Sequence, residues 1–227
     1  MGEGDNVRFA LALAVKDITV ELRRAHELLS IIAFSMTSIL VSSFAWRGSL
    51  IRTPEVLSAA LWIVIYFSSI LALTTSFARE VDRGTIEGLR SLPTPPFVVL
   101  VGKVIYSLVV LLLVLITTVL SSIIFLNMDV TVIPALLVLL VVGVMDLALV
   151  GSVVSALVMY SEGKTLLLSF LFFPVSVPVL IPCTQAAGRI LAGFTLLEVL
   201  PEIQLLVSFM LAIGVASFLL FGHVFQE

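Results

Sequence analysis

The chain has 227 residues, of which 60% are hydrophobic and 12% are charged. Soluble domains carry about twice that charged share, so this chain cannot cover its apolar surface with polar groups in water. The formal net charge of −3 argues against a basic nucleic-acid-binding face, and the single cysteine excludes an internal disulfide or a multi-cysteine metal site. We therefore expect an integral membrane protein that is solvated mostly by the lipid bilayer and binds no nucleic acid.

The first residues, 1–6, are polar and acidic, and they lack the basic start and short apolar core of a cleaved signal peptide. We therefore expect the first apolar span to be retained as a membrane anchor. Residues 7–27 carry one apolar stripe at helical spacing. This pattern fits an amphipathic helix lying in the headgroup plane or a solvated helix ahead of a span. The stripe consists of Leu11, Val15, Ile18 and Leu22.

Six long apolar runs follow, and each is judged against the about 20 residues that cross about 30 Å of hydrocarbon. The runs lie at about 28–46, 55–78, 97–126, 131–160, 165–182 and 201–225. The stretch 183–200 is too short and too polar to span comfortably, and it could form short re-entrant helices buried against protein. We therefore predict an all-α membrane protein with six transmembrane helices, in which 1–227 is a single domain.

The basic residues predict the orientation of these spans. With the N-terminus inside, nine of the twelve lysines and arginines lie in inner segments, and three lie in outer segments. The outer three are Arg47, Arg52 and Arg189. The positive-inside rule therefore predicts a multi-pass protein of the cytoplasmic membrane with both termini in the cytoplasm.

The largest predicted cytoplasmic loop, 79–96, is short, dense in charge and closed by a proline cluster. A turn at Gly84 precedes a short helix that begins near Thr85, and the prolines from Pro93 onward end that helix. The loop could dock in a groove of another protein, or it could be a solvated loop that only satisfies the orientation rule. The apolar positions on one face of the short helix are Ile86, Leu89 and Leu92.

The string FAREVDRGTIEGLRSLPTPPFVVLVGKV at 77–104 resembles the corresponding segment of the cytochrome c maturation protein B (CcmB) family. Two further stretches, 143–151 and the proline-containing 166–187, are also similar, so the resemblance covers nearly the whole chain. It implies an ABC-2-like permease, the membrane subunit of a haem exporter that also serves to release a haem-loaded chaperone. The positions that match in the first string are Glu80, Asp82, Gly84, Thr85, Glu87, Leu89, Leu92 and Pro93.

The resemblance further implies that this chain is not an enzyme and works with partners. ATP and Mg²⁺ are expected in a separate ABC ATPase subunit, because this sequence contains no GxxxxGK[ST] phosphate loop. The matching residues of the loop would form a coupling helix seated in that ATPase, whose closure would shift the spans between inward- and outward-facing states. Other cytochrome c maturation membrane subunits are implied as further partners.

Haem is expected as a transported or handled ligand and not as a resident cofactor of this chain. Axial haem ligands are usually His, Met, Cys or Tyr. The two histidines, His26 and His223, lie near the cytoplasmic ends of predicted spans, and no CxxCH motif occurs. We therefore predict no cofactor or metal bound by this chain alone, with a partner subunit holding the haem.

Asp146 and the prolines of the fifth span are weak candidates for the translocation path. Asp146 lies in the middle of the fourth span, where a charged group costs about 2.5–3.5 kcal/mol on insertion scales. It could line the path, or it could hydrogen-bond to a neighbouring Ser or Thr. Pro174 and Pro178, with Pro182 beyond them, could form a hinge beside a polar cavity or a fixed packing bend.

Small residues in the fourth span, Gly143 and Gly151, predict close helix packing. We expect Cys183 to be a buried apolar residue, and we expect Glu198 and Glu202 to be unpaired and solvated on the outside.

Two alternative functions remain open from the sequence. One is an ABC-2-type permease for a lipid, polymer or drug, since such permeases share the six-span plan and the acidic loop. The other is a membrane scaffold that holds an assembly complex together without moving anything. A partner with a phosphate loop would support a permease, and haem-handling partners would select the haem exporter.

Overall fold

The computed structural model describes residues 3–23, 25–46, 53–73, 78–82, 84–90 and 94–224. These ranges are mostly helical, with short turns between the helices, and contain no strand. Six of the helices, α2, α3, α6, α7, α8 and α9, are long and apolar enough to cross a membrane, which confirms the all-α fold class. The elements are α1 (Glu3–Leu22), α2 (Ala25–Trp46), α3 (Pro54–Leu73), α4 (Ala78–Asp82), α5 (Ile86–Arg90), α6 (Pro96–Leu126), the 3₁₀ helix η1 (Val130–Val132), α7 (Ile133–Val158), α8 (Lys164–Leu191) and α9 (Leu200–Val224).

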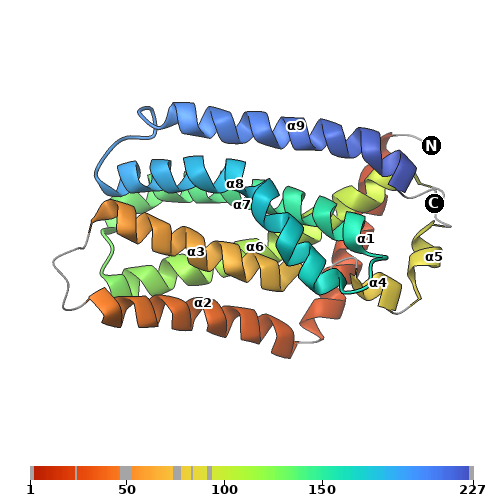
Figure 1. The fold of residues 1–227 in the computed structure, drawn as a ribbon, viewed down its shortest axis with the longest axis horizontal. Coiled ribbons are helices and arrows are strands. Elements are labelled where there is room, and N and C mark those ends of the chain that lie inside the picture. Colours follow the sequence, from red (N-terminus) through yellow and green to blue (C-terminus); the bar gives the residue numbers. More distant parts are fainter. Residues whose placement is uncertain are drawn as a thin grey trace.

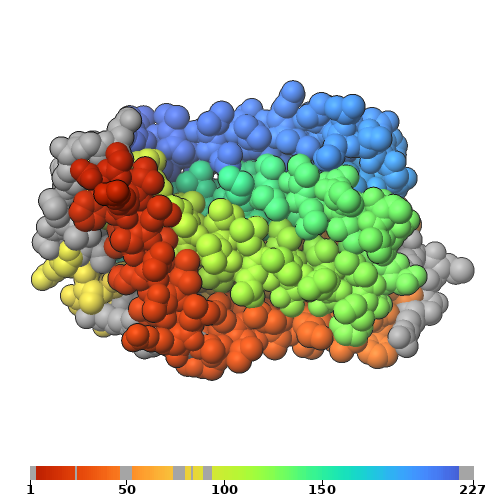
Figure 2. Space-filling view, turned by 180° about the vertical axis from the view of Figure 1, so that it is seen from behind, coloured from red at the N-terminus to blue at the C-terminus, as the bar shows by residue number. Residues whose placement is uncertain are grey.

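The six long helices run side by side, and α1, α4 and α5 lie together at one end of the bundle (Figure 1). Helix α6 packs against α1, α2 and α7, while α8 packs against α3, α7 and α9. From behind, α1 runs across the end of the bundle next to α6 (Figure 2). Large apolar side chains such as Phe44, Ile124 and Phe170 remain exposed on the outside. Such an outer surface suits helices whose surroundings are lipid tails.

Helices α6 and α9 coincide with the predicted spans at 97–126 and 201–225 to within one residue at each end. The N-terminal region differs from its prediction, because the helix expected over 7–27 ends at Leu22 and α2 begins at Ala25. Three residues of the predicted apolar stripe of α1 are exposed, with Leu11 48%, Val15 60% and Leu22 62% exposed, whereas the fourth, Ile18, is partly buried and packs against the core of the bundle. An exposed apolar stripe beside membrane spans favours the headgroup-plane interpretation.

The structure corrects the prediction for the fifth span. Helix α8 continues without a break from Lys164 past Pro182 to Leu191, so the predicted end at 182 and the re-entrant helices within 183–200 are wrong. Each proline removes one backbone hydrogen bond, but packing by neighbours can hold such a helix together. The residues of this extension that are buried against neighbouring helices are Cys183, Ala186, Ala187 and Ile190.

The connection from α8 to α9 also differs from its prediction, because both glutamates have partners. Glu202 Oε1 accepts a hydrogen bond from Arg189 Nη1 at 2.6 Å. Glu198 Oε2 accepts from the backbone N and the hydroxyl of Thr195, both at 2.8 Å. The expectation that these two carboxylates are unpaired was therefore wrong, and they fasten the turns between the two helices.

Close packing at the small residues of α7 is confirmed. A Cβ added at Gly143 would lie 2.3 Å from Trp62 Cη2 and 2.6 Å from Cys183 Sγ. At Gly151 it would lie 2.1 Å from Leu73 Cδ1. Trp62, Leu73 and Cys183 are each at most 1% exposed, which confirms the buried cysteine and leaves these neighbours little room to move.

Gly143→Ala is therefore expected to lower the stability of the bundle by about 1–3 kcal/mol, because the added methyl group overpacks the contact of α7 with α3 and α8. Thermal unfolding of the purified protein in detergent measures the change. Gly214→Ala in α9 is the matched control, since a Cβ there has no described neighbour within 4 Å. Equal melting temperatures for the two variants would show that the contact tolerates a side chain.

Candidate coupling site

Four charged residues from three helices meet at the end of the bundle that carries α1, α4 and α5. We call Lys16 and Asp17 of α1, Glu80 of α4 and Lys103 of α6 the charge quartet. Glu80 Oε1 accepts hydrogen bonds from Lys16 Nζ at 2.8 Å and from Lys103 Nζ at 2.9 Å. Asp17 lies 2.8 Å from Lys103 Nζ and 3.3 Å from Lys16 Nζ. With two cations and two anions, the charge quartet is balanced.

Three members of the charge quartet are shielded from solvent, whereas the side chain of Lys16 is 45% exposed. Lys103 is 2% exposed, Glu80 7% and Asp17 9%. Burial raises the pKa of Glu80. The positive charge of Lys103 and the hydrogen bonds that Glu80 accepts from Lys16, Thr85 and Lys103 outweigh this effect and lower the pKa to about 2. Burial lowers the pKa of Lys16, but its hydrogen bond to Glu80 and the charge of Asp17 bring a net rise. Removing either lysine would therefore leave the buried carboxylate of Glu80 with less compensating positive charge.

The length of α6 puts the charge quartet near the membrane surface. Helix α6 has 31 residues, which makes it about 46 Å long against about 30 Å of hydrocarbon. If Leu126 lies at the far boundary of the hydrocarbon, the first turns of α6 extend beyond the near boundary. Lys103 then lies in the headgroup layer, where a buried but paired charge is tolerated.

The predicted cytoplasmic loop 79–96, which we call the coupling segment, folds back on Glu80 at the turn between α4 and α5. Gly84 adopts a φ of +67°, a left-handed conformation that favours glycine and makes the turn between α4 and α5. Across this turn the backbone N of Thr85 donates to the carbonyl of Glu80 at 2.9 Å. The hydroxyl of Thr85 donates to the Glu80 carboxylate. The predicted turn and short helix are therefore present, and they orient Glu80 toward the bundle.

Further contacts attach the coupling segment to the remaining helices. Ile86 of α5 is 7% exposed and packs in an apolar cluster with Leu13 of α1, Leu100 of α6 and Met159. Asp82 forms an ion pair with Lys164, the first residue of α8. Through Glu80, Ile86 and Asp82 the coupling segment thus reaches α1, α6, α8 and the end of α7.

The predicted coupling residues divide into two groups. Glu80 and Asp82 bind side chains of other helices and Thr85 binds Glu80, whereas Glu87 is exposed. Leu92 and Pro93 lie outside the described residues, as does the side chain of Leu89. Their expected contact with an ATPase stays a prediction.

Sequence reasoning did not identify the partners of Glu80. Lys103 offered a signal, because a lysine inside the apolar run FVVLVGKVIYSLVV requires a carboxylate nearby. That carboxylate could not be assigned, since Asp17 and Glu80 are remote from Lys103 in the sequence. A second link between α1 and α6 was also missed: Tyr106 Oη donates to Glu21 Oε2 at 2.9 Å, with both side chains buried.

Asp146 is fully buried in the middle of α7. Within the described part of the chain, neither of its carboxylate oxygens has a hydrogen-bond partner, so the bond to a Ser or Thr that we considered is absent there. Pro174 and Pro178 lie on the exposed side of α8, whereas Pro182 is buried. Pro174 and Pro178 therefore do not face the interior in which Asp146 is buried.

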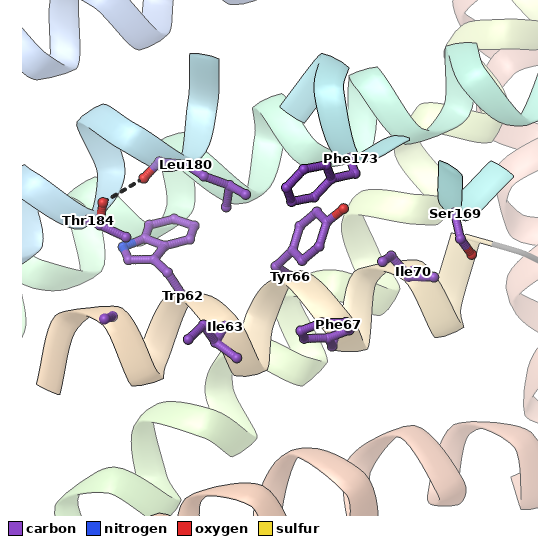
Figure 3. A pocket seen from close by; sticks show the side chains of 10 residues that line it. Trp62, Ile63, Tyr66, Phe67, Ile70, Ser169, Phe173, Leu180 and Thr184 are labelled. Atoms are coloured by element: carbon purple, nitrogen blue, oxygen red, sulfur yellow. Dashed lines mark hydrogen bonds between the residues drawn. The ribbon is translucent and has the colours of Figure 1, made fainter. Parts of the chain in front are cut away.

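A groove of about 380 Å³ lies between α3 and α8 (Figure 3). Its aromatic lining comes from Trp62, Tyr66, Phe67 and Phe173, and none of the ten described side chains that line it is charged. The ring of Tyr66 also stacks on Phe172, with centroids 5.4 Å apart and an interplanar angle of 2°. Such a groove suits an apolar molecule better than an ion.

Two comparisons relate this chain to known proteins. A curated relative from Bradyrhizobium diazoefficiens, described as "Heme exporter protein B", is 27% identical over 184 residues, which is 80% of this chain and 82% of the relative. A family model described as "CcmB protein" matches residues 8–224, a range that contains the charge quartet and the coupling segment. Because that match spans nearly the whole sequence, the chain belongs to the CcmB family.

Proposed function

We propose that this chain is the membrane permease subunit of an ABC-type haem export system, driven by a separate ATPase subunit that binds the coupling segment. Membership of the CcmB family and the printed name of the relative support a haem export role. Six helices long and apolar enough to cross a membrane support a membrane-spanning permease. In this proposal the ATPase holds ATP and Mg²⁺, and haem is the cargo. Other cytochrome c maturation membrane subunits are further partners of this chain. The same family membership does not favour an unrelated cargo or a passive scaffold.

The observation that carries the ATPase part of the proposal is the attachment of the coupling segment. Glu80, Asp82 and Ile86 attach this segment to several helices at once, while Glu87 remains exposed for a partner. A partner that displaces α5 therefore displaces the ends of those helices. Such a connection is what a nucleotide-driven population shift between two transporter states requires.

The orientation is part of the same proposal. Helix α1, the final turns of α9 and the coupling segment lie at one end of the bundle (Figure 1). The positive-inside rule assigns this end to the cytoplasm, where an ATPase has access to ATP. Both termini are then cytoplasmic.

Glu87→Lys is expected to reduce co-purification of the ATPase about tenfold, because it reverses a charge on the exposed side of α5. The matched control is Glu162→Lys, which makes the same reversal at an exposed residue of the α7–α8 connection at the same end. The measurement is the amount of ATPase retained by affinity-purified protein, followed by ATP-dependent haem delivery. If Glu87→Lys leaves both assembly and delivery at the wild-type level, the coupling assignment is wrong.

A further inference from the structure

Glu80 and Glu87, two of the three acidic residues that we expected to couple this chain to an ATPase, are placed differently, because Glu80 is buried and Glu87 is exposed. We propose that Glu80 is a positioning residue: it fastens the coupling segment to α1 and α6, so that these helices move with the segment, and it does not itself contact the ATPase. The proposal rests on the proposed function for the source of the motion. The attachment itself is a property of this chain and can be tested alone.

The carboxylate of Glu80 is fully used within the chain. Its Oε1 accepts from Lys16 and Lys103, and its Oε2 accepts from the hydroxyl of Thr85. At 7% exposure, the side chain offers little surface to a partner. Glu87, in contrast, is exposed. A partner that binds the acidic surface of this segment therefore contacts Glu87, while Glu80 attaches the opposite side of the segment to α1 and α6.

The short helices of the segment need such a fastening. Helices α4 and α5 have five residues each, which is too short for a helix to persist in water on its own. Ile86 fixes α5 through apolar contacts, and the pair of Asp82 with Lys164 is weak because the Asp82 side chain is 63% exposed. Helix α4 is thus attached to α1 and α6 by the buried polar bonds of Glu80 and by the partly buried Val81, which packs against the same apolar cluster as Ile86.

The variants must distinguish the loss of the attachment through Glu80 from the loss of charge balance within the charge quartet. Glu80→Gln alone leaves Lys103 with less negative charge and can disturb folding. The double variant Glu80→Gln/Lys103→Met removes one anion and one cation, and it leaves Lys16 and Asp17, which lie 3.3 Å apart, as a pair. It therefore restores the charge balance without restoring the attachment. Glu80→Asp keeps the charge, and Glu87→Gln is the control on the exposed side.

The first test uses the purified chain in lipid nanodiscs without any partner. Trypsin can cleave the coupling region after Arg79, Arg83 and Arg90. Because cleavage requires local opening, the double variant is expected to be cut about fivefold faster than wild type, and Glu87→Gln at about the wild-type rate. Glu80→Asp should recover part of the protection. A double variant that is cut no faster than wild type overturns the attachment, whatever the partner is.

The second test uses the complex with its ATPase. The double variant is expected to retain the ATPase and to hydrolyse ATP, while ATP-dependent haem delivery falls about tenfold because α1 and α6 no longer follow the segment. Delivery at the wild-type level would overturn the proposal, and so would loss of the ATPase, since Glu80 would then be a contact residue. If the wild-type chain binds no ATPase, the proposed function fails, and the trypsin result alone decides the attachment.

Discussion

Lys103→Met is expected to lower the stability of the protein by about 3–5 kcal/mol, because it leaves the buried carboxylates of Asp17 and Glu80 with Lys16 as their nearest cation. That loss is a large part of the stability of an ordinary domain, so little intact protein should accumulate in the membrane fraction. The measurements are the amount of protein in isolated membranes and its thermal unfolding in detergent.

Lys164→Met is the matched control for that prediction. It makes the same substitution at the same end of the bundle, but it removes a pair in which the Asp82 side chain is 63% exposed, so a loss of at most about 1 kcal/mol is expected. Lys103→Met/Asp17→Asn should recover most of the stability, because it leaves Lys16 with Glu80. Equal losses of stability for Lys103→Met and Lys164→Met would show that the buried charge quartet contributes no more to stability than the exposed ion pair of Asp82 with Lys164.

Asp146→Leu is expected to raise the stability of the bundle by about 2–3 kcal/mol, because it replaces a carboxyl in the middle of a span by an apolar side chain. The described residues offer its oxygens no hydrogen bond that the substitution would break. The melting temperature in detergent measures the gain. If Asp146 lines the translocation path, ATP-dependent haem delivery should fall in this more stable variant.

Two controls make the result for Asp146 specific. Asp129→Leu removes a carboxylate that accepts a hydrogen bond from the backbone N of Thr131 at 2.9 Å, so it should lower the stability by about 1 kcal/mol. Asp146→Asn preserves the shape and polarity of the side chain. A loss of stability in Asp146→Leu would show that the carboxyl has a favourable partner. Unchanged haem delivery in both variants of Asp146 would remove it from the path.

The sequence predicted the spans well where hydropathy alone decides them, as for α6 and α9. It failed at Pro182, because a proline shows which backbone bond is lost but not whether neighbours hold the helix together. Helix α8 continues there because small and apolar residues after Pro182 remain buried against other helices. The division of the N-terminal region into an interfacial helix and a first span was predicted, but its boundary was placed a few residues too late, since the charged residues around it carry no clear end signal.

The candidate site was predictable only in its local features. The turn at Gly84 and the short helix from Ile86 follow from residue types that act within a few positions. The pairing of Glu80 with Lys16 and Lys103 depends on how α1, α4 and α6 come together in space. A single sequence does not contain that information. For the same reason the structure, and not the sequence, separates the inward Glu80 from the exposed Glu87.

The seclusion of Cys183 has a practical consequence for measuring motion in this protein. It is the single cysteine of the chain, and its thiol is fully buried beside Gly143 of α7. A thiol shielded in this way reacts slowly with labelling reagents. Cysteines introduced at Gly88 of α5, where a Cβ meets no described atom within 4 Å, and at Glu162 can therefore be spin-labelled selectively in an otherwise native background. The distance between the two labels during ATP turnover then reports the displacement of α5 relative to the α7–α8 connection.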